Sequence, residues 1–276
     1  MPENKMLKNI LMLKRGGVVS LVGAGGKTTL MFRLAQELSA SGASVLTTTT
    51  TKIFMPDEHQ SPHVVLSPSL AEVLKNAKHL LKNTLHLSAG SAHLSSGNKL
   101  LGFTPEGVDM LWKSGIFRWI LVEADGAARR PLKAPASHEP VIPKSSGWII
   151  GLAGLDVVGK PLTEQWVFRP ERYADITGTA LGEPVTEASL VRAILHSNGI
   201  FGAWKSPLAK YLVFLNKADC RQSADVGQKI CRLFAASGKT RICRVVIGKL
   251  LHEQPVVAYD DLYQLPEKAS YHPAYP

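Results

Sequence analysis

Residues 18–30 read Val18-Val19-Ser20-Leu21-Val22-Gly23-Ala24-Gly25-Gly26-Lys27-Thr28-Thr29-Leu30: an apolar run, a glycine-rich turn and a Lys-Thr-Thr sequence. This order predicts a strand, a phosphate loop over residues 23–29 and the start of a helix. Glycines let successive backbone N–H groups point inward at a phosphate, and the helix N-terminus adds positive potential. Lys27 would reach the β- and γ-phosphates, and the hydroxyl of Thr28 would ligate Mg²⁺. We therefore expect the chain to bind a nucleoside triphosphate.

The loop departs from the usual pattern G-x-x-x-x-G-K-[ST], because Leu21 stands where that pattern has its first glycine. The short form G-x-x-G-K-T-T that remains resembles the phosphate loop of Mur-type peptide ligases. A turn that needs glycine only for tight packing is the alternative, but it does not call for Lys27 and Thr28 at the start of the helix.

Size and composition indicate a globular protein. The chain has 276 residues, 45% of them hydrophobic and 20% charged, which is enough for one large α/β domain or two small ones. No apolar run approaches the length of a membrane span, and the first residues lack the features of a secretory signal. Three dispersed cysteines without a C-x-x-C pair are typical of a cytoplasmic protein. The net charge of +10 is not concentrated in a tail, so nucleic-acid binding is permitted but not indicated.

Apolar, β-branched runs alternate with segments of helical period, which predicts a three-layer α/β fold of the P-loop NTPase type, with a mainly parallel sheet flanked by helices. We expect one domain over residues 1–265, with a loop insertion around 129–176 and a tail at 266–276. The expected strands are Val18–Val22, Ser44–Thr48, Val64–Leu66, Leu85–Ser88, Phe117–Val122, Trp148–Leu152, Tyr211–Leu215 and Ile242–Ile247. The expected helices are a short one before the first strand and Lys27–Ser41, Ser69–Lys82, Pro105–Ser114, Thr186–His196 and Ser223–Ala236.

A second motif, Glu123-Ala124-Asp125-Gly126, follows the apolar run Trp119–Val122. Parallel sheets present ligand-binding groups at the carboxyl ends of their strands, and a carboxylate there can hold Mg²⁺ or orient the attacking water beside a γ-phosphate. Glu123-x-x-Gly126 also resembles the D-x-x-G motif of GTPases, in which the glycine N–H touches the γ-phosphate. The alternative is a strand that merely ends in an acidic turn.

A third motif, Asn216-Lys217-Ala218-Asp219, ends the apolar run Tyr211–Leu215 and resembles the N-K-x-D guanine-specificity motif of GTPases. There the aspartate accepts two N–H bonds from guanine, and adenine offers no matching donors. Such donor–acceptor pairing can reject the wrong base strongly. Asp219 would read the base while Asn216 and Lys217 flank it, which favours GTP without excluding ATP.

Two further segments contain candidate residues. Thr47–Lys52 has five threonines at a predicted strand end, and Thr49 could reach the metal, although threonine is also an ordinary strand residue. Arg129, Arg130 and Lys133 follow the acidic strand, and Arg129 is the candidate for stabilising charge on a transferred phosphate.

Taken together, the glycine-rich loop, the threonine run, Glu123–Gly126, Pro131-Leu132-Lys133-Ala134-Pro135, His138-Glu139-Pro140, Gly151–Asp156 and Arg169-Pro170-Glu171 resemble the YqeC family of selenium-dependent hydroxylase accessory proteins. The resemblance covers most of residues 15–220. It implies a cytosolic, nucleotide-binding protein that assists the maturation of a selenium-containing molybdenum hydroxylase. The partner would be that hydroxylase or its maturation machinery.

Three functions fit these observations. The favoured one is Mg²⁺-dependent binding and hydrolysis of GTP or ATP, in which Lys27, Glu123, Asp125 and Arg129 act on the phosphates. A nucleotide-dependent transferase or ligase is the second, as the short phosphate loop indicates. The third is a module that grips a partner protein under nucleotide control.

Overall fold

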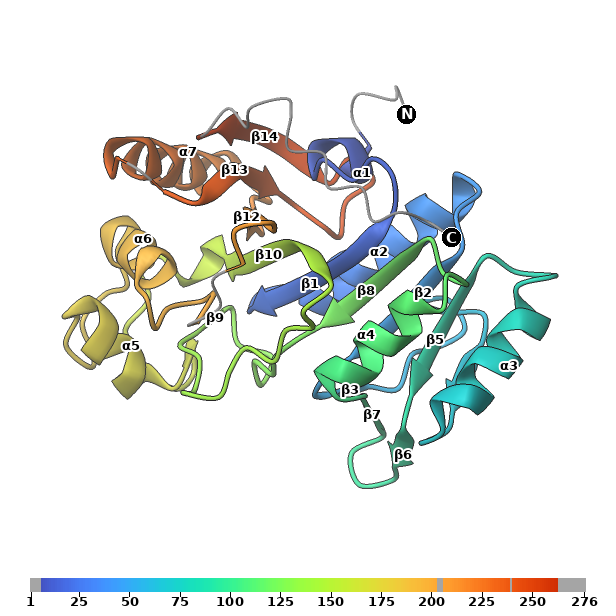
Figure 1. Cartoon of the computed structure of the whole chain (residues 1–276). Coiled ribbons are helices and arrows are strands. Elements are labelled where there is room, and N and C mark those ends of the chain that lie inside the picture. Colours follow the sequence, from blue (N-terminus) through green and yellow to red (C-terminus); the bar gives the residue numbers. More distant parts are fainter. Residues whose placement is uncertain (1–5, 203–205, 239, 263–276) are drawn as a thin grey trace. The chain divides into compact units, whose positions relative to one another are not determined.

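The computed structural model describes residues 6–202, 206–238 and 240–262. Contacts divide the chain into two compact units. The first contains the described residues of Met1–Leu21, Lys27–Gly126 and Val141–Trp148, and the second those of Val22–Gly26, Ala127–Pro140 and Ile149–Pro276. Both are built from strands flanked by helices, which is the predicted α/β class (Figure 1).

The first unit contains a parallel sheet with the strand order β1-β8-β2-β5-β4. Its strands are β1 (Gly17–Gly23, of which residues 17–21 belong to this unit), β2 (Val45–Thr49), β4 (Val64–Leu66), β5 (His86–Gly90) and β8 (Trp119–Glu123). The helices of this unit are α1 (Leu7–Ile10), α2 (Lys27–Ala40), α3 (Leu70–Leu80) and α4 (Pro105–Lys113). A small antiparallel sheet has the order β3 (Lys52–Phe54), β7 (Lys99–Leu101), β6 (Ala92–Leu94).

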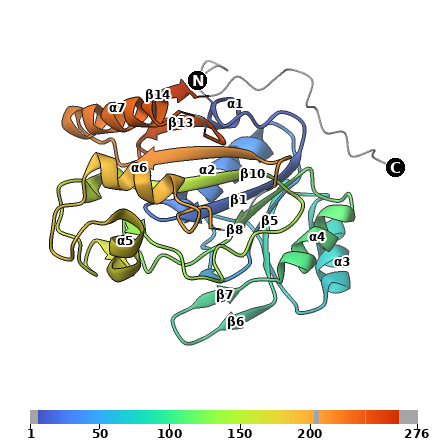
Figure 2. The same cartoon turned by 60° about the vertical axis from the view of Figure 1, so that its left-hand side comes forward.

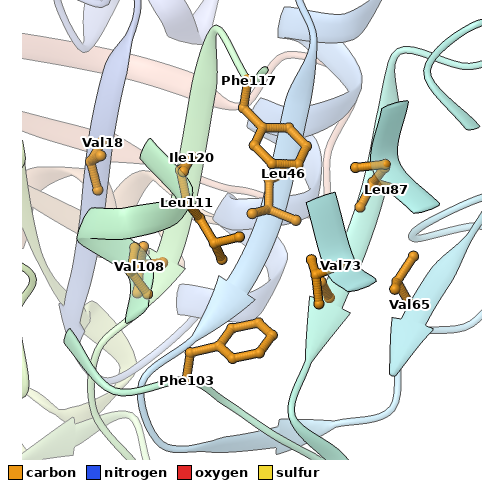
Figure 3. Packing of buried hydrophobic residues seen from close by; sticks show 13 residues of the cluster. Val18, Leu46, Val65, Val73, Leu87, Phe103, Val108, Leu111, Phe117 and Ile120 are labelled. Carbon is orange, nitrogen blue, oxygen red and sulfur yellow. The ribbon is translucent and has the colours of Figure 1, made fainter. Parts of the chain in front are cut away.

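The core of the first unit follows from the strand register. Val18 lies opposite Ile120, Leu46 lies between Ile120 and Leu87, and all four are fully buried on one face (Figure 3). Helices α3 and α4 contact each other and contribute Val73, Ala77, Val108 and Leu111 to the same cluster. The intervening strand residues point the other way, since side chains alternate along a strand, and α2 packs against β2 and β8. The motif residues therefore follow strands that are held firmly by packing.

The second unit has the strand order β14-β13-β12-β10. The strands are β10 (Ser146–Gly154, from Ile149 in this unit), β12 (Lys210–Asn216), β13 (Ile242–Gly248) and β14 (Val256–Asp261); β12 and β13 are parallel, whereas β14 is antiparallel to β13. The helices are the 3₁₀ turn η2 (Leu155–Val157), α5 (Pro170–Thr177), α6 (Glu187–Leu195) and α7 (Arg221–Ala236), with α6 packed against both α5 and α7 (Figure 2). A two-stranded parallel ladder joins β9 (Leu132–Lys133) to β11 (Val167–Phe168).

The eight expected strands and the six expected helices are all present, with ends displaced by a few residues. Helix ends follow the capping chemistry expected of them: Thr104 accepts from Gly107 N–H before α4, and Ser69 from Glu72 N–H before α3. The loop insertion expected around 129–176 also contains the short strands β9 and β11 and most of the helix α5, none of which was predicted. No helix in the described ranges is long and apolar enough to cross a bilayer. The single domain over 1–265 stays a prediction, and the predicted tail lies outside the described residues.

Candidate functional site

The glycine-rich loop follows β1. Its backbone conformation and its close neighbours exclude side chains larger than that of glycine. Gly25 and Gly26 have φ angles of 83° and 136°, in the region that favours glycine. A Cβ on Gly25 would lie 2.8 Å from the carbonyl oxygen of Pro131, and one on Gly26 would collide with the amide of Asn216. The loop is thus closely packed against Pro131 and Asn216, and the helix α2 begins immediately after it at Lys27. This is the local geometry that a phosphate loop requires.

The side chain of Lys27 meets the acidic motif that follows β8. Its ammonium lies 3.2 Å from Oδ1 of Asp125 and 3.5 Å from Oε1 of Glu123. The hydroxyl of Thr28 donates to Oε2 of Glu123 at 2.7 Å. All three charged side chains are buried, with 4%, 0% and 9% of the Lys27, Asp125 and Glu123 side chains exposed. Both carboxylates therefore face the same ammonium, as alternation along the strand predicts.

Two carboxylates, those of Glu123 and Asp125, face the ammonium of Lys27. Burial raises the pKa of Glu123, and the attraction of Lys27 and the hydrogen bond from Thr28 offset only part of that effect. Burial alone would lower the pKa of Lys27, but the attraction of Asp125 and Glu123 exceeds it, so that the pKa of Lys27 is raised.

The threonine run lies at the end of β2, next to the acidic strand. The hydroxyl of Thr49 donates to the backbone oxygen of Glu123 at 2.6 Å and accepts from Thr51 N–H at 3.0 Å. The side chain of Thr49 thus fixes the strand end that carries Glu123, and its binding of a metal stays a prediction. Thr50 donates to the carbonyl oxygen of Val141 at 2.6 Å.

In the second unit, the Asn216 side chain joins the N-K-x-D turn to two other segments. Its Nδ2 donates to the carbonyl oxygen of Gly25 at 2.7 Å, and its Oδ1 accepts from Leu250 N–H at 3.0 Å. Ala218, two residues after Asn216, donates its N–H to Gly248 O at 2.9 Å. The turn is therefore held against both the phosphate loop and the end of β13.

The charged residues of the same turn have partners in the protein. Lys217 Nζ pairs with Oδ2 of Asp156 at 2.7 Å, and Asp219 Oδ1 lies 3.3 Å from Nε2 of His252. The side chains of Lys217 and Asp219 are 38% and 56% exposed, so both are accessible to a ligand. Asp156 is the last residue of the Gly151–Asp156 stretch on which the family resemblance partly rests.

The segment from Pro131 to Pro143, which has four prolines, contains Lys133 and Glu139, two members of an ion-pair cluster that the sequence did not predict. Glu139 pairs with Lys133 at 2.9 Å and with Arg169 at 2.7 Å, and accepts from Ala136 N–H at 3.0 Å. The Lys133 side chain is 0% exposed. Burial alone would raise the pKa of Glu139, but Lys133 and the donors from Ala136 and Arg169 lower it to about 2. Opposite charges six residues apart in a proline-rich loop were the available signal. Lys133 is thus engaged in an internal ion pair.

Arg129 is exposed and has a left-handed φ of 59°, as does the preceding Ala128 with 47°. Two consecutive non-glycine residues in this region are uncommon and cost energy. The action of Arg129 on a phosphate stays a prediction, and so does the contact of Gly126 N–H with a γ-phosphate.

Comparisons with known proteins bear on most of these segments. The model of the YqeC protein family matches residues 19–171, which include the phosphate loop, the acidic motif and the Glu139 cluster. The Escherichia coli (strain K12) protein described as "Uncharacterized protein YqeC" is 39% identical over 188 residues, which are 68% of this chain and 71% of that protein.

Among solved structures, FtsY from Mycoplasma mycoides aligns with a TM-score of 0.40 and 12% identity, over 94% of this chain and 68% of that one. That likeness is too distant to assign any residue a role. The family match covers more than half of the chain and agrees with the relative from Escherichia coli. The chain belongs to the YqeC family.

Proposed function

We propose that this protein binds a magnesium-bound nucleoside triphosphate, GTP in preference to ATP, and hydrolyses it. The observation that carries the proposal is the meeting of Lys27 with Glu123 and Asp125 directly after a glycine-rich loop. A lysine that opens a helix and is balanced by buried carboxylates is the arrangement that a polyphosphate and its cation would complete. In the hydrolysis, water adds to the γ-phosphorus, the bond to the β–γ bridging oxygen breaks, and a nucleoside diphosphate and inorganic phosphate leave.

The donor set fits Mg²⁺, which prefers hydroxyl and carboxylate oxygens. Thr28 and the carboxylates of Glu123 and Asp125 would hold it, directly or through water. When bound, Mg²⁺ would neutralise charge on the phosphates. Its positive charge would also attract both carboxylates, leaving Lys27 to exchange its carboxylate partners for phosphate oxygens.

The remaining site residues have roles that follow from their positions. The backbone N–H of Ala24 donates to Leu152 O at 2.9 Å, so those of Gly25 and Gly26 would hold the β-phosphate, and Gly126 N–H would contact the γ-phosphate. Glu123 or Asp125 would orient the attacking water. Arg129 would stabilise charge that develops on the transferred phosphate. Positioning and charge supply the catalysis, because phosphoryl transfer needs little covalent chemistry from the protein.

The preference for guanine is supported by the N-K-x-D turn. Asn216 holds this turn to Gly25 of the phosphate loop, and Asp219 is accessible at its end. Asp219 would exchange His252 for the two N–H donors on the guanine edge. Adenine lacks those donors, and the unpaired carboxylate would penalise it.

The biological setting that we propose rests on the family resemblance. The protein would act in the cytoplasm on a selenium-dependent molybdenum hydroxylase, or on the proteins that mature it. Its three cysteines are free thiols, as a reducing compartment requires.

The short phosphate loop favours one other function, a ligase or transferase that activates a small acid. In that case release of ADP or phosphate would depend on the second substrate. With nucleotide and Mg²⁺ alone, steady release of phosphate would support the hydrolase, and its absence would support the ligase.

Calorimetric titration with GTP, ATP and their diphosphates in the presence of Mg²⁺ tests the proposal. Lys27→Ala should lose at least tenfold in affinity for the triphosphates. Lys75→Ala, which removes an exposed lysine of α3, is the matched control and should bind as the wild type does. Equal affinity of the wild type and Lys27→Ala for every ligand would overturn the assignment.

A further inference from the structure

The ion pair between Lys217 and Asp156 links two segments that are distant in sequence. Lys217 follows β12, and Asp156 lies in η2 immediately after β10. Their 2.7 Å contact is short for a hydrogen bond between an ammonium and a carboxylate. Both side chains are nevertheless more than a third exposed. A pair exposed to this degree contributes little to folding, since water screens the charges. The main effect of the ion pair is therefore the position that it gives to the Lys217 side chain.

The backbone at Lys217 is already fixed in an unfavourable conformation. Its φ is 68°, in the left-handed region that non-glycine residues rarely adopt. Hydrogen bonds of the two neighbouring residues maintain this conformation. Asn216 is hydrogen-bonded to Gly25 and Leu250, and Ala218 to Gly248. Strain of this kind persists where the surroundings over-determine it, and it is enriched at ligand-binding sites. The only freedom left to Lys217 is in its side chain, which Asp156 then restrains.

The other carboxylate oxygen of Asp156 also argues against a purely structural role. Oδ1 is buried and has no hydrogen-bond donor in the part of the chain that the structure describes. A buried acceptor without a donor is unfavourable for the folded state. The carboxylate is accommodated because position 154 is glycine: a Cβ there would lie 2.5 Å from Oδ1.

Gly154 in turn connects Asp156 to the phosphate loop. Its N–H donates to Pro131 O at 2.8 Å, and Gly25 packs so closely on the backbone of Gly154 that no Cβ would fit between them. The phosphate loop, the β10 turn and the N-K-x-D turn of the second unit thus share one framework. Among the described residues of this framework, Asp156 is the one charged residue whose side chain forms an ion pair with Lys217.

We propose that Asp156 is a positioning residue for base recognition: it holds the Lys217 ammonium so that the aliphatic stem of Lys217 forms one wall of the guanine subsite. This inference rests on the proposed function and adds the residue that sets base preference through the lysine. Asp219 would supply the hydrogen bonds to the base edge, whereas the Lys217–Asp156 pair would restrict where the ring can lie. A Lys217 side chain that is already held in place strengthens the preference for guanine over adenine, because less side-chain entropy is lost when the base binds.

The test is calorimetric titration of the full chain with GTP, ATP and inorganic tripolyphosphate, each with Mg²⁺. Tripolyphosphate has no base and reports on the phosphate loop alone. Asp156→Asn should weaken GTP about tenfold and leave tripolyphosphate within twofold of the wild type. Asp225→Asn, at an exposed position of α7, is the matched control and should change neither. Lys217→Ala and the double variant Asp156→Asn/Lys217→Ala should bind GTP equally, because Asp156 acts through the lysine.

The outcomes separate this inference from the proposed function. A wild type that binds none of the three probes contradicts the proposed function and with it the role of Asp156. A wild type that prefers GTP, with the same preference in Asp156→Asn, overturns the role of Asp156 alone. An equal loss of GTP and tripolyphosphate affinity in Asp156→Asn would also overturn it, since that pattern marks general damage to the framework. Asp156→Glu, which keeps the carboxylate, should restore part of the preference.

Discussion

Asn216 donates its side-chain amide to the carbonyl oxygen of Gly25 at 2.7 Å, across 191 residues of sequence. The same side chain accepts from Leu250 N–H, so its donor and its acceptor are both used and its orientation is fixed. Asn216 is 6% exposed, and neither bond can be replaced readily by water.

We predict that Asn216→Asp weakens nucleotide binding about tenfold and lowers the unfolding temperature. The new carboxylate would face Gly25 O, an acceptor, in place of a donor, and two acceptors repel each other. Titration with GTP and a thermal melt measure both effects. Asn198→Asp, on an exposed turn of the same unit, is the control. Wild-type affinity in Asn216→Asp would mean that the turn does not support the phosphate loop.

Lys27→Ala should destabilise the protein by ~3–5 kcal/mol at neutral pH, because it removes the ammonium that faces two buried carboxylates. Without the ammonium the pKa of Glu123, already raised by burial, would rise further. An acid whose pKa is higher in the folded than in the unfolded state contributes stability below its unfolded pKa and loses it as the pH rises. The deficit of Lys27→Ala relative to the wild type should therefore be smaller at pH 5 than at pH 8, measured by urea unfolding.

Magnesium distinguishes the electrostatic explanation from a packing defect. Mg²⁺ without nucleotide should raise the unfolding temperature of Lys27→Ala more than that of the wild type, because the cation can take the place of the ammonium between Glu123 and Asp125. Lys27→Met, of similar length but uncharged, should behave as Lys27→Ala does. A destabilisation that depends on neither pH nor Mg²⁺ would contradict the charge argument.

The strand ends that the sequence predicted correctly are those that follow a long apolar run. Gly23, Glu123 and Asn216 each end a buried strand, and the runs before them are long enough to predict both the strand and the edge at which it ends. Alternation along the strand places Glu123 and Asp125 on the same side, and the structure shows that both face Lys27 there. Local sequence is sufficient wherever a motif and its strand are contiguous.

The contacts that the sequence did not reveal join distant segments. Lys217 and Asp156 are 61 residues apart, and Glu139 and Arg169 are 30 apart, with no periodic pattern between them. Helix α5 was missed for a local reason: its segment Pro170–Thr177 is largely polar, and its described buried residues are only Pro170, Tyr173 and Thr177. Hydrophobic period is a weak signal for so short a helix.

Glu139→Gln should cost ~3–5 kcal/mol of stability, because the fully buried Lys133 ammonium would lose the carboxylate that lies 2.9 Å from it. The pKa of Glu139 is lowered to about 2, so the ion pair contributes fully above the unfolded pKa near 4.5 and is lost as the pH falls toward 2. Urea unfolding at pH 7 measures the cost. Glu183→Gln, an exposed position in the same unit, is the control. A loss below 1 kcal/mol would show that Lys133 finds another partner or water.

The buried His86 should make the stability of the first unit sensitive to acid. Burial lowers its pKa from about 6.5 to about 4, and its Nε2 lies 3.1 Å from the hydroxyl of Thr47. Because the unfolded chain binds the proton more readily, the neutral ring contributes stability that is complete above pH 6.5 and declines as the pH falls toward 4. The decline amounts to at most about 3 kcal/mol. In His86→Gln the unfolding free energy should vary less between pH 7 and pH 4.5, whereas His79→Gln, on the exposed side of α3, should follow the wild type. If His86→Gln lost as much stability over that range as the wild type, protonation of His86 would not be the cause.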